Sequence, residues 1–156
     1  MTQQADFSLI KAGFMTKART LTDYFPHSYQ VTDDEADVNR GAVNYMILRP
    51  GAVPIATVPG LGNSKKIYEA NWNIVFDLQV KYKSFKTAWT DFGTIRDAVL
   101  NKFVFTTDQS LPGVLNVWNV SITAPDLPGQ KPPAGTPTWI GQQLVAIVTQ
   151  KIDISR

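Results

Sequence analysis

The sequence predicts a single α+β domain spanning residues 1–156, with a mixed or antiparallel sheet of four to five strands and two helices packed on one face. Two observations carry this prediction. Apolar and polar residues alternate from Ala70 to Tyr82, whereas segments 6–25 and 85–103 repeat their apolar residues at helical spacing. With 44% hydrophobic and 18% charged residues, the chain is too apolar for a disordered protein and large enough for one core.

The first predicted helix runs from Asp6 to Phe25 and is stopped by Pro26. Gly13 inside it costs about 1 kcal/mol relative to alanine. An acidic loop follows, and then Ala42 to Leu48 is predicted as a short strand. The apolar stripe that predicts the helix consists of Ile10, Phe14, Ala18, Leu21 and Phe25.

The alternating segment is the longest predicted strand and is expected to be the central element of the sheet. At about 3.3 Å per residue it would run roughly 43 Å, as far as a compact chain of this size is wide. Each inward residue contributes about 1.5–3 kcal/mol when fully buried. The preceding segment, 51–66, is rich in proline and glycine and is predicted as a loop, in which residues 55–58 are a candidate short strand.

The remaining elements follow the long strand. The second helix ends near Phe103, with either Ser84 or Thr90 as its N-cap. Segments Gly113–Ala124 and Leu144–Ile154 alternate again and are predicted as strands. The segment between them carries five of the ten prolines, which excludes a helix or a central strand there.

Composition excludes several classes of function. The chain has no cysteine and one histidine, which rules out disulfides, thiolate metal sites and cysteine nucleophiles. A net charge of +2 is too small to make nucleic acid the expected main partner. No run is long enough to span a membrane and no secretion signal opens the sequence. We therefore expect a cytoplasmic protein, unless it leaves the cell inside a larger particle.

Three features resemble active-site motifs, and each has a plainer interpretation. The acidic cluster lacks the ligand spacing and turn glycine of a calcium loop. The segment Gly60–Lys66 lacks the spacer and ending of a phosphate-binding loop. His27 follows a helix end, where a histidine more often caps or packs than catalyses. We expect no enzyme, no metal and no cofactor. The acidic cluster consists of Asp33, Asp34, Glu35 and Asp37.

Lysines gather around the long strand and raise the alternative of nucleic-acid binding. Alternate lysines beside aromatic residues can hold a nucleic-acid backbone. Trp72, Tyr82 and Trp89, however, fall in the apolar register, and lysines also keep exposed strands soluble. The second interpretation is favoured. The lysines are Lys65, Lys66, Lys81, Lys83 and Lys86.

Two proline-rich loops favour a component of an assembly. Eight of the ten prolines lie in segments 50–59 and 125–137. Because proline stiffens a loop, less entropy is lost when a partner holds it. A long strand also offers its edge to a neighbouring subunit.

Three stretches resemble the tail terminator proteins of long-tailed, lambda-like siphovirus bacteriophages. The stretch "YEANWNIVFDLQVKYK" is similar to that family's tryptophan-bearing long strand. The stretch "AWTDFGTIRDAVLNKF" resembles the helix that follows it, and "TWIGQQLVAIVTQKIDI" resembles the family's final strand. Together they lie within residues 68–103 and 138–154, whereas segments 51–66 and 125–137 are longer than the family needs.

The resemblance implies a non-enzymatic virion protein without a cofactor. Six copies would form a homo-oligomeric ring at the head-proximal end of the tail tube, stop its polymerisation and join it to the head-side connector. DNA would pass through the lumen without sequence-specific binding. Candidates for ring or lumen contacts are Asp77, Gln79, Lys81 and Lys83. Candidate loop contacts with tube and connector are Pro54, Pro59, Lys65, Lys66, Pro128, Lys131 and Pro133.

Other interpretations stay open at this point. A neck or head-completion protein, which also joins head and tail, would share the small α+β core and the absence of chemistry. A nucleic-acid-binding module would use the lysine-flanked sheet. An enzyme acting through His27 is the third alternative.

Overall fold

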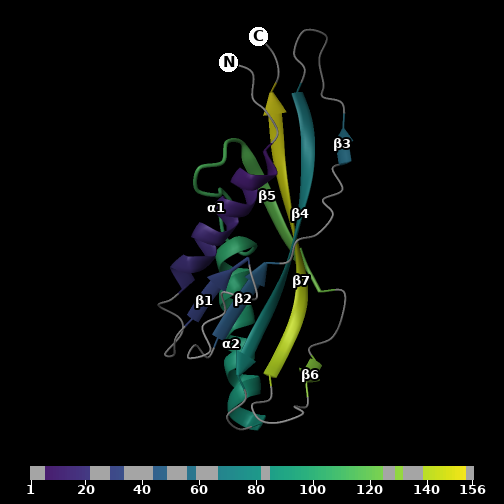
Figure 1. Cartoon of the computed structure of the whole chain (residues 1–156). Helices are drawn as coiled ribbons and strands as arrows, with labels where there is room; N and C mark the ends of the chain where they lie inside the picture. Colours follow the sequence, from purple (N-terminus) through teal and green to yellow (C-terminus); the bar gives the residue numbers. More distant parts are fainter. Residues whose placement is uncertain are drawn as a thin grey trace.

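The protein is an α+β fold in which two helices lie against one face of a sheet (Figure 1). The computed structural model describes residues 6–21, 29–33, 44–48, 56–58, 67–81, 85–124, 129–131 and 139–153. The predicted fold class and both predicted helices are confirmed. The helices are α1, Phe7–Arg19, and α2, Phe85–Phe103. The strands are β1, Tyr29–Thr32; β2, Asn44–Leu48; β3, Ala56–Val58; β4, Ile67–Lys81; β5, Val117–Thr123; β6, Gly129–Lys131; and β7, Trp139–Asp153.

The sheet is mixed. Its strand order is β1-β2-β4-β7-β5, while β3 pairs with β4 and β6 pairs with β7. The pairing of β1 with β2 is parallel, and every other pairing among the described strands is antiparallel. The short strands β2 and β3 therefore both line the side of β4 that β7 leaves open.

The centre of the sheet is the ladder between β4 and β7. Both strands have 15 residues, and they pair without a register shift from Ile67 opposite Asp153 to Lys81 opposite Trp139. Figure 1 shows this pair running along most of the molecule. The long central strand is thus confirmed, but β7 starts at Trp139 rather than at Leu144. Its first residues pair with Asp77 to Lys81, which gives that end of β4 its backbone hydrogen-bond partners.

Both helices cover the face of β4 that the apolar alternation predicts. The even-numbered residues of β4 from Ala70 to Val80 are at most 2% exposed. The ring of Phe14 in α1 lies 4.4 Å from that of Phe103 in α2 and 5.4 Å from that of Phe76 in β4. Since one side chain touches both other elements, the two helices and the sheet share one core.

Helix α1 begins where the sequence predicts and ends earlier. The carboxylate of Asp6 caps it by accepting hydrogen bonds from the backbone N–H groups of Ser8 (2.9 Å) and Leu9 (3.3 Å). The helix ends at Arg19 instead of Phe25. The hydroxyl of Thr20 donates to the carbonyl of Lys17 (2.7 Å), which tightens the last turn. Leu21 is still buried, as the apolar stripe predicts, and Phe25 lies outside the described residues.

Two strands exceed the predicted four to five, and both are short. Strand β1 lies between Pro26 and the acidic loop, and its Val31 and Thr32 are buried. Strand β6 lies in the proline-rich segment and adds to the edge of β7 only. Strand β6 has no alternation and β1 alternates over four residues only, and each of them pairs with a longer strand. Helix α2 begins at Phe85, which favours the earlier of the two predicted start points.

Candidate functional site

The candidate site is the face of the sheet that carries no helix, which we call the outer face. On β4 it is formed by the residues that alternate with the buried ones. The register places the matching residues of β7 and β5 beside them. Most of these side chains are half-buried. The outer face consists of Glu69, Asn71, Asn73, Val75, Asp77, Gln79, Asn119, Ser121, Thr123, Gly141, Gln143, Val145, Ile147, Thr149 and Lys151.

The centre of the outer face is apolar and its surroundings are polar but largely uncharged. Val75 lies directly opposite Val145, and Ile147 is the next outer-face residue along β7. Around them, the hydroxyl of Thr149 donates to the side-chain oxygen of Asn71 (2.9 Å). The charged residues of this face are Glu69, Asp77 and Lys151, with Lys81 and Asp153 in the same alternation at the two ends of the β4–β7 ladder. A weakly charged face with an apolar centre suits contact with another protein better than contact with phosphates.

Two of the four predicted ring or lumen residues lie on this outer face. Asp77 and Gln79 are half-buried there. Lys81 is the last residue of β4 and is placed by its backbone register only, opposite Trp139. Lys83 lies outside the described residues.

The structure brings together two lysines that the sequence assigned to different contacts. Lys131 of β6 also pairs with Trp139, on the side opposite Lys81. The register therefore places Lys81, Trp139 and Lys131 in one row across three strands at one end of the sheet. The other predicted loop contacts lie outside the described residues; they are Pro54, Pro59, Lys65, Lys66, Pro128 and Pro133.

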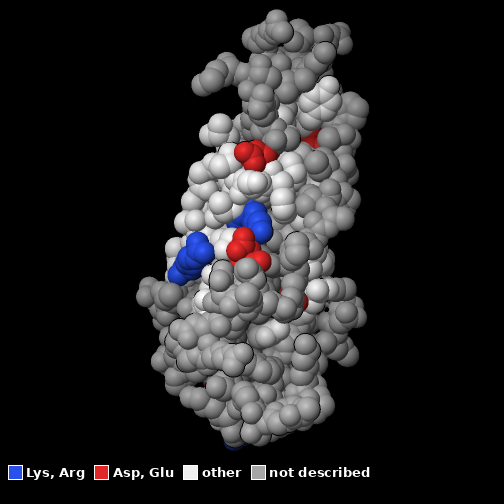
Figure 2. All heavy atoms as spheres, in the orientation of Figure 1, with Lys and Arg blue, Asp and Glu red and all other residues white. Residues whose placement is uncertain are grey.

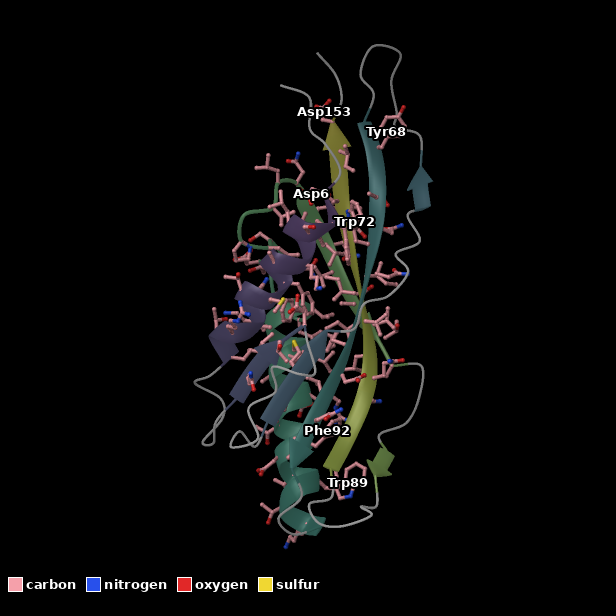
Figure 3. The ribbon with its side chains drawn as sticks, viewed as in Figure 1. Asp6, Tyr68, Trp72, Trp89, Phe92 and Asp153 are labelled. Atoms are coloured by element: carbon pink, nitrogen blue, oxygen red, sulfur yellow. The ribbon has the colours of Figure 1, made fainter. Side chains whose placement is uncertain are left out.

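Trp72 lies in the core and away from the outer face. It is 2% exposed, its ring stacks on that of Phe7 at 5.9 Å, and its indole N–H donates to the side-chain oxygen of Gln150 (3.1 Å). Gln150 in turn donates to the carbonyl of Leu115 (2.9 Å). Figure 3 shows Trp72 beside the start of α1, with Trp89 towards the opposite end of the molecule. Trp72 is thus a core residue joining α1, β4 and β7.

The edge at β5 is a feature that the sequence analysis missed. Trp118 lies in a register shift between Val117 and Asn119 and is 50% exposed, with the ammonium of Lys151 5.7 Å from its ring centre. Leu115 nearby in the chain is 70% exposed. The two consecutive apolar residues Val117 and Trp118, which break the alternation, are the sequence signal for this bulge.

Charges on the face that carries α1 are mixed. The ammonium of Lys11 lies 3.0 Å from the carboxylate of Asp33, and this hydrogen bond lowers the pKa of Asp33. Basic and acidic side chains lie next to one another on the described part of this face (Figure 2). The described part of this face thus presents no single-sign patch of the kind that steers nucleic acid.

One lysine is buried. Lys17 is 7% exposed, and its ammonium donates to the carbonyls of Asp108 (3.0 Å) and Ser110 (2.9 Å) while lying 5.4 Å from the centre of the Phe103 ring. Burial lowers the pKa of Lys17, nearby Lys102 lowers it further, and the charge of Asp108 partly opposes the shift. The backbone N–H and hydroxyl of Ser110 donate to the carboxylate of Asp108 and lower the pKa of Asp108.

The described residues show no constellation for metal chemistry. Across those ranges no three His, Cys, Asp or Glu side chains lie close enough to hold a metal ion. His27, Asp34, Glu35, Asp37 and segment 60–66 lie outside them. Neither described helix has the length and apolar character needed to cross a membrane.

Comparison with known proteins adds no relative. No family model matches the chain, and no curated protein matches it in sequence.

Proposed function

We propose that this protein is a structural virion subunit, a tail terminator assembled in the host cytoplasm. Six copies form a ring at the head-proximal end of the phage tail tube, stop its polymerisation and join it to the head-side connector. DNA passes through the lumen of the ring. This role requires no catalysis and no cofactor. The observation that carries the proposal is the outer face.

The outer face has the composition of a surface that another subunit covers. Its centre combines Val75, Val145 and Ile147 with neighbouring amide and hydroxyl groups, and it carries few charges. The segments that resemble tail terminators, 68–103 and 138–154, contain α2, β7 and all of β4 except Ile67, and these elements build the middle of the fold. We assign the outer face to contacts between copies.

A charge placed in the outer face tests this assignment. We expect native mass spectrometry to find a closed hexamer for the wild type and smaller species for Val145→Glu, because a buried unpaired carboxylate opposes association. The control is Asn101→Glu, which adds the same charge at an exposed position of α2. Both variants should keep the wild-type circular dichroism spectrum. A folded Val145→Glu protein that forms the wild-type ring would exclude this face as the contact.

Tube capping tests the role itself. Wild-type protein added to polymerising tail-tube protein should stop tube growth at substoichiometric amounts. A wild type that is monomeric at every concentration and leaves tube length unchanged would contradict the proposal. A neck or head-completion protein is the alternative within the same particle, and it would bind isolated heads rather than isolated tails.

A second candidate function, nucleic-acid binding, is favoured by the row of Lys81, Trp139 and Lys131. Two lysines flanking an aromatic residue suit a single-stranded backbone with a stacked base. This function predicts affinity for short DNA that falls steeply with salt and is lost in Lys81→Glu/Lys131→Glu. A ring subunit predicts little affinity at any salt concentration.

A further inference from the structure

The side chain of Gln109 occupies the outer edge of β5. Its amide nitrogen donates to the carbonyl of Val120 (3.4 Å) and to that of Val104 (3.0 Å), the residue that follows α2. Its amide oxygen accepts from the backbone N–H of Val120 (3.4 Å). One carboxamide thus contacts both the donor and the acceptor of a single strand residue.

This arrangement imitates a neighbouring strand. Val120 lies opposite Val148 of β7, yet both of its backbone polar groups point to Gln109 and so away from β7. A primary carboxamide has one C=O and two N–H groups, so it can offer the acceptor and the donor of a peptide group, and here it stands where the peptide group of an added strand would be. Because backbone groups alternate along a strand, those of Ile122 face the same side as those of Val120.

The edge has little other protection. No described strand pairs with the outer side of β5. The strand, "VWNVSIT", contains no charge and no proline, two of the features that keep edge strands from pairing, and its bulge at Trp118 lies outside the segment from Val120 to Ile122. Both hydrogen bonds between Gln109 and Val120 are 3.4 Å long and therefore weak, so an added strand can replace them. Trp118 and Leu115 leave exposed apolar surface next to this edge.

We propose that the β5 edge is a strand-accepting surface, closed in the free chain by Gln109, and that its occupant is β5 of a second copy in antiparallel pairing. A second copy fits because β5 is uncharged. Pairing β5 of one copy with β5 of another therefore brings no like charges together. In a two-fold pairing both copies use the same surface, so each copy contributes its exposed Trp118 to the contact. This inference does not rest on the proposed ring, whose contact we assign to the outer face.

The test removes the competing side chain. In the wild type, Gln109 closes the β5 edge in a fraction of the molecules, which lowers the apparent affinity of one copy for another. In Gln109→Ala, sedimentation velocity should therefore show self-association at a concentration about tenfold lower than in the wild type. Hydrogen exchange should locate the contact. At low concentration the amide of Val120 should exchange faster in the variant than in the wild type, and at high concentration the amides of Val120 and Ile122 should both become protected.

The control variant is Gln109→Ala/Trp118→Lys, which adds a lysine at an exposed position of the strand that is not part of the outer face and should return association to the wild-type level. A folded Gln109→Ala protein that associates no more than the wild type overturns the proposal. So does association that leaves the amides of Val120 and Ile122 unprotected, or protection that appears only when a different protein is added. If the variant does not fold, wild-type protein must show Ile122 protection that rises with concentration, and its absence overturns the proposal.

Discussion

The ammonium of Lys17 lies inside the protein, where it joins α1 to the loop that follows α2. Its two carbonyl partners, on Asp108 and Ser110, belong to that loop, and its aliphatic stem is buried with the rest of the side chain. The charge is stabilised by these carbonyl dipoles and by the face of the Phe103 ring. Lys17 therefore holds a loop in place, and nothing in its surroundings suggests a chemical role.

Lys17→Met tests this structural role. Methionine keeps much of the stem's packing and removes the ammonium, so that two charge-assisted hydrogen bonds are lost. We expect the free energy of unfolding to fall by about 1–2 kcal/mol. Urea unfolding at neutral pH measures it. The exposed Arg19→Met provides a comparison in the same turn and should change stability far less.

Alkaline pH should affect the wild type and Lys17→Met differently. The pKa of Lys17 in the folded protein is lowered from 10.5, so the unfolded chain binds this proton more tightly. The contribution of Lys17 to stability therefore rises as pH increases from its lowered pKa towards 10.5. Unfolding measured at about pH 8 and about pH 10 should show the difference between wild type and variant growing with pH. An unchanged difference would contradict the lowered pKa.

At the scale of the element, the two helices each contain one glycine, and their surroundings differ. A Cβ atom at Gly13 of α1 would lie 2.7 Å from the carbonyl oxygen of Pro112 and 3.0 Å from a methyl of Val114. A Cβ atom at Gly93 of α2 would meet no atom within 4 Å among the described residues. Gly13 is thus required by the close approach of a loop, whereas nothing in the structure explains Gly93.

Substituting each glycine by alanine should change stability in opposite directions. Gly13→Ala gains about 1 kcal/mol of helix propensity. The added Cβ atom, however, would push the backbone at Pro112 away from α1, and overpacking of this kind costs about 1–3 kcal/mol. Gly93→Ala meets open space and should raise the free energy of unfolding by about 0.5–1 kcal/mol. Thermal and urea unfolding of the two variants, measured side by side, provides the check. Equal effects would exclude the Pro112 contact as the cause.

The elements that the sequence predicts are those whose own side chains determine them. Strand β4 alternates through the whole of its buried face, and α1 carries both its cap, Asp6, and its apolar stripe. Strands β1 and β6 and the first residues of β7 depend instead on pairing with a partner strand. Local pattern cannot predict such segments, because the cause of their conformation lies elsewhere in the chain.

The same distinction applies to the candidate site. Alternation alone places Asp77 and Gln79 on the face opposite the core, and the structure agrees. The position of Lys131 beside Trp139 requires the register between β6 and β7, and the contact of Gln109 with Val120 requires a loop to return to the sheet. No spacing within the sequence encodes either one.

At the scale of the whole molecule, one core supports two unlike faces of the sheet. The helix-covered face of β4 is nearly fully buried, whereas the outer face is half-buried and mostly polar. Strands β4 and β7 form the middle of this sheet. Other strands pair with β4 on one side and with β7 on the other. The β4–β7 ladder is therefore the part of the described structure that opens only when the whole domain unfolds.

Native-state hydrogen exchange should rank the elements accordingly. We expect the slowest amides in the paired middle of β4 and β7, for instance at Ile74 and Ala146, with opening free energies equal to that of global unfolding. Amides in the first turn of α1 and in β5 should exchange faster, since they lie at the periphery of the described structure. Amides of α1 that outlast those of β4 would show that the ladder opens independently.

The uninterrupted register between β4 and β7 also restricts how this sequence can change during evolution. Side chains in a strand alternate between faces, so a deletion of one residue within β4 would transfer every later side chain to the opposite face. Core residues such as Phe76 and Leu78 would then exchange places with Asp77 and Gln79. Descendants of this protein can substitute residues along the ladder one at a time, but changes in length should accumulate only in the segments that connect its strands.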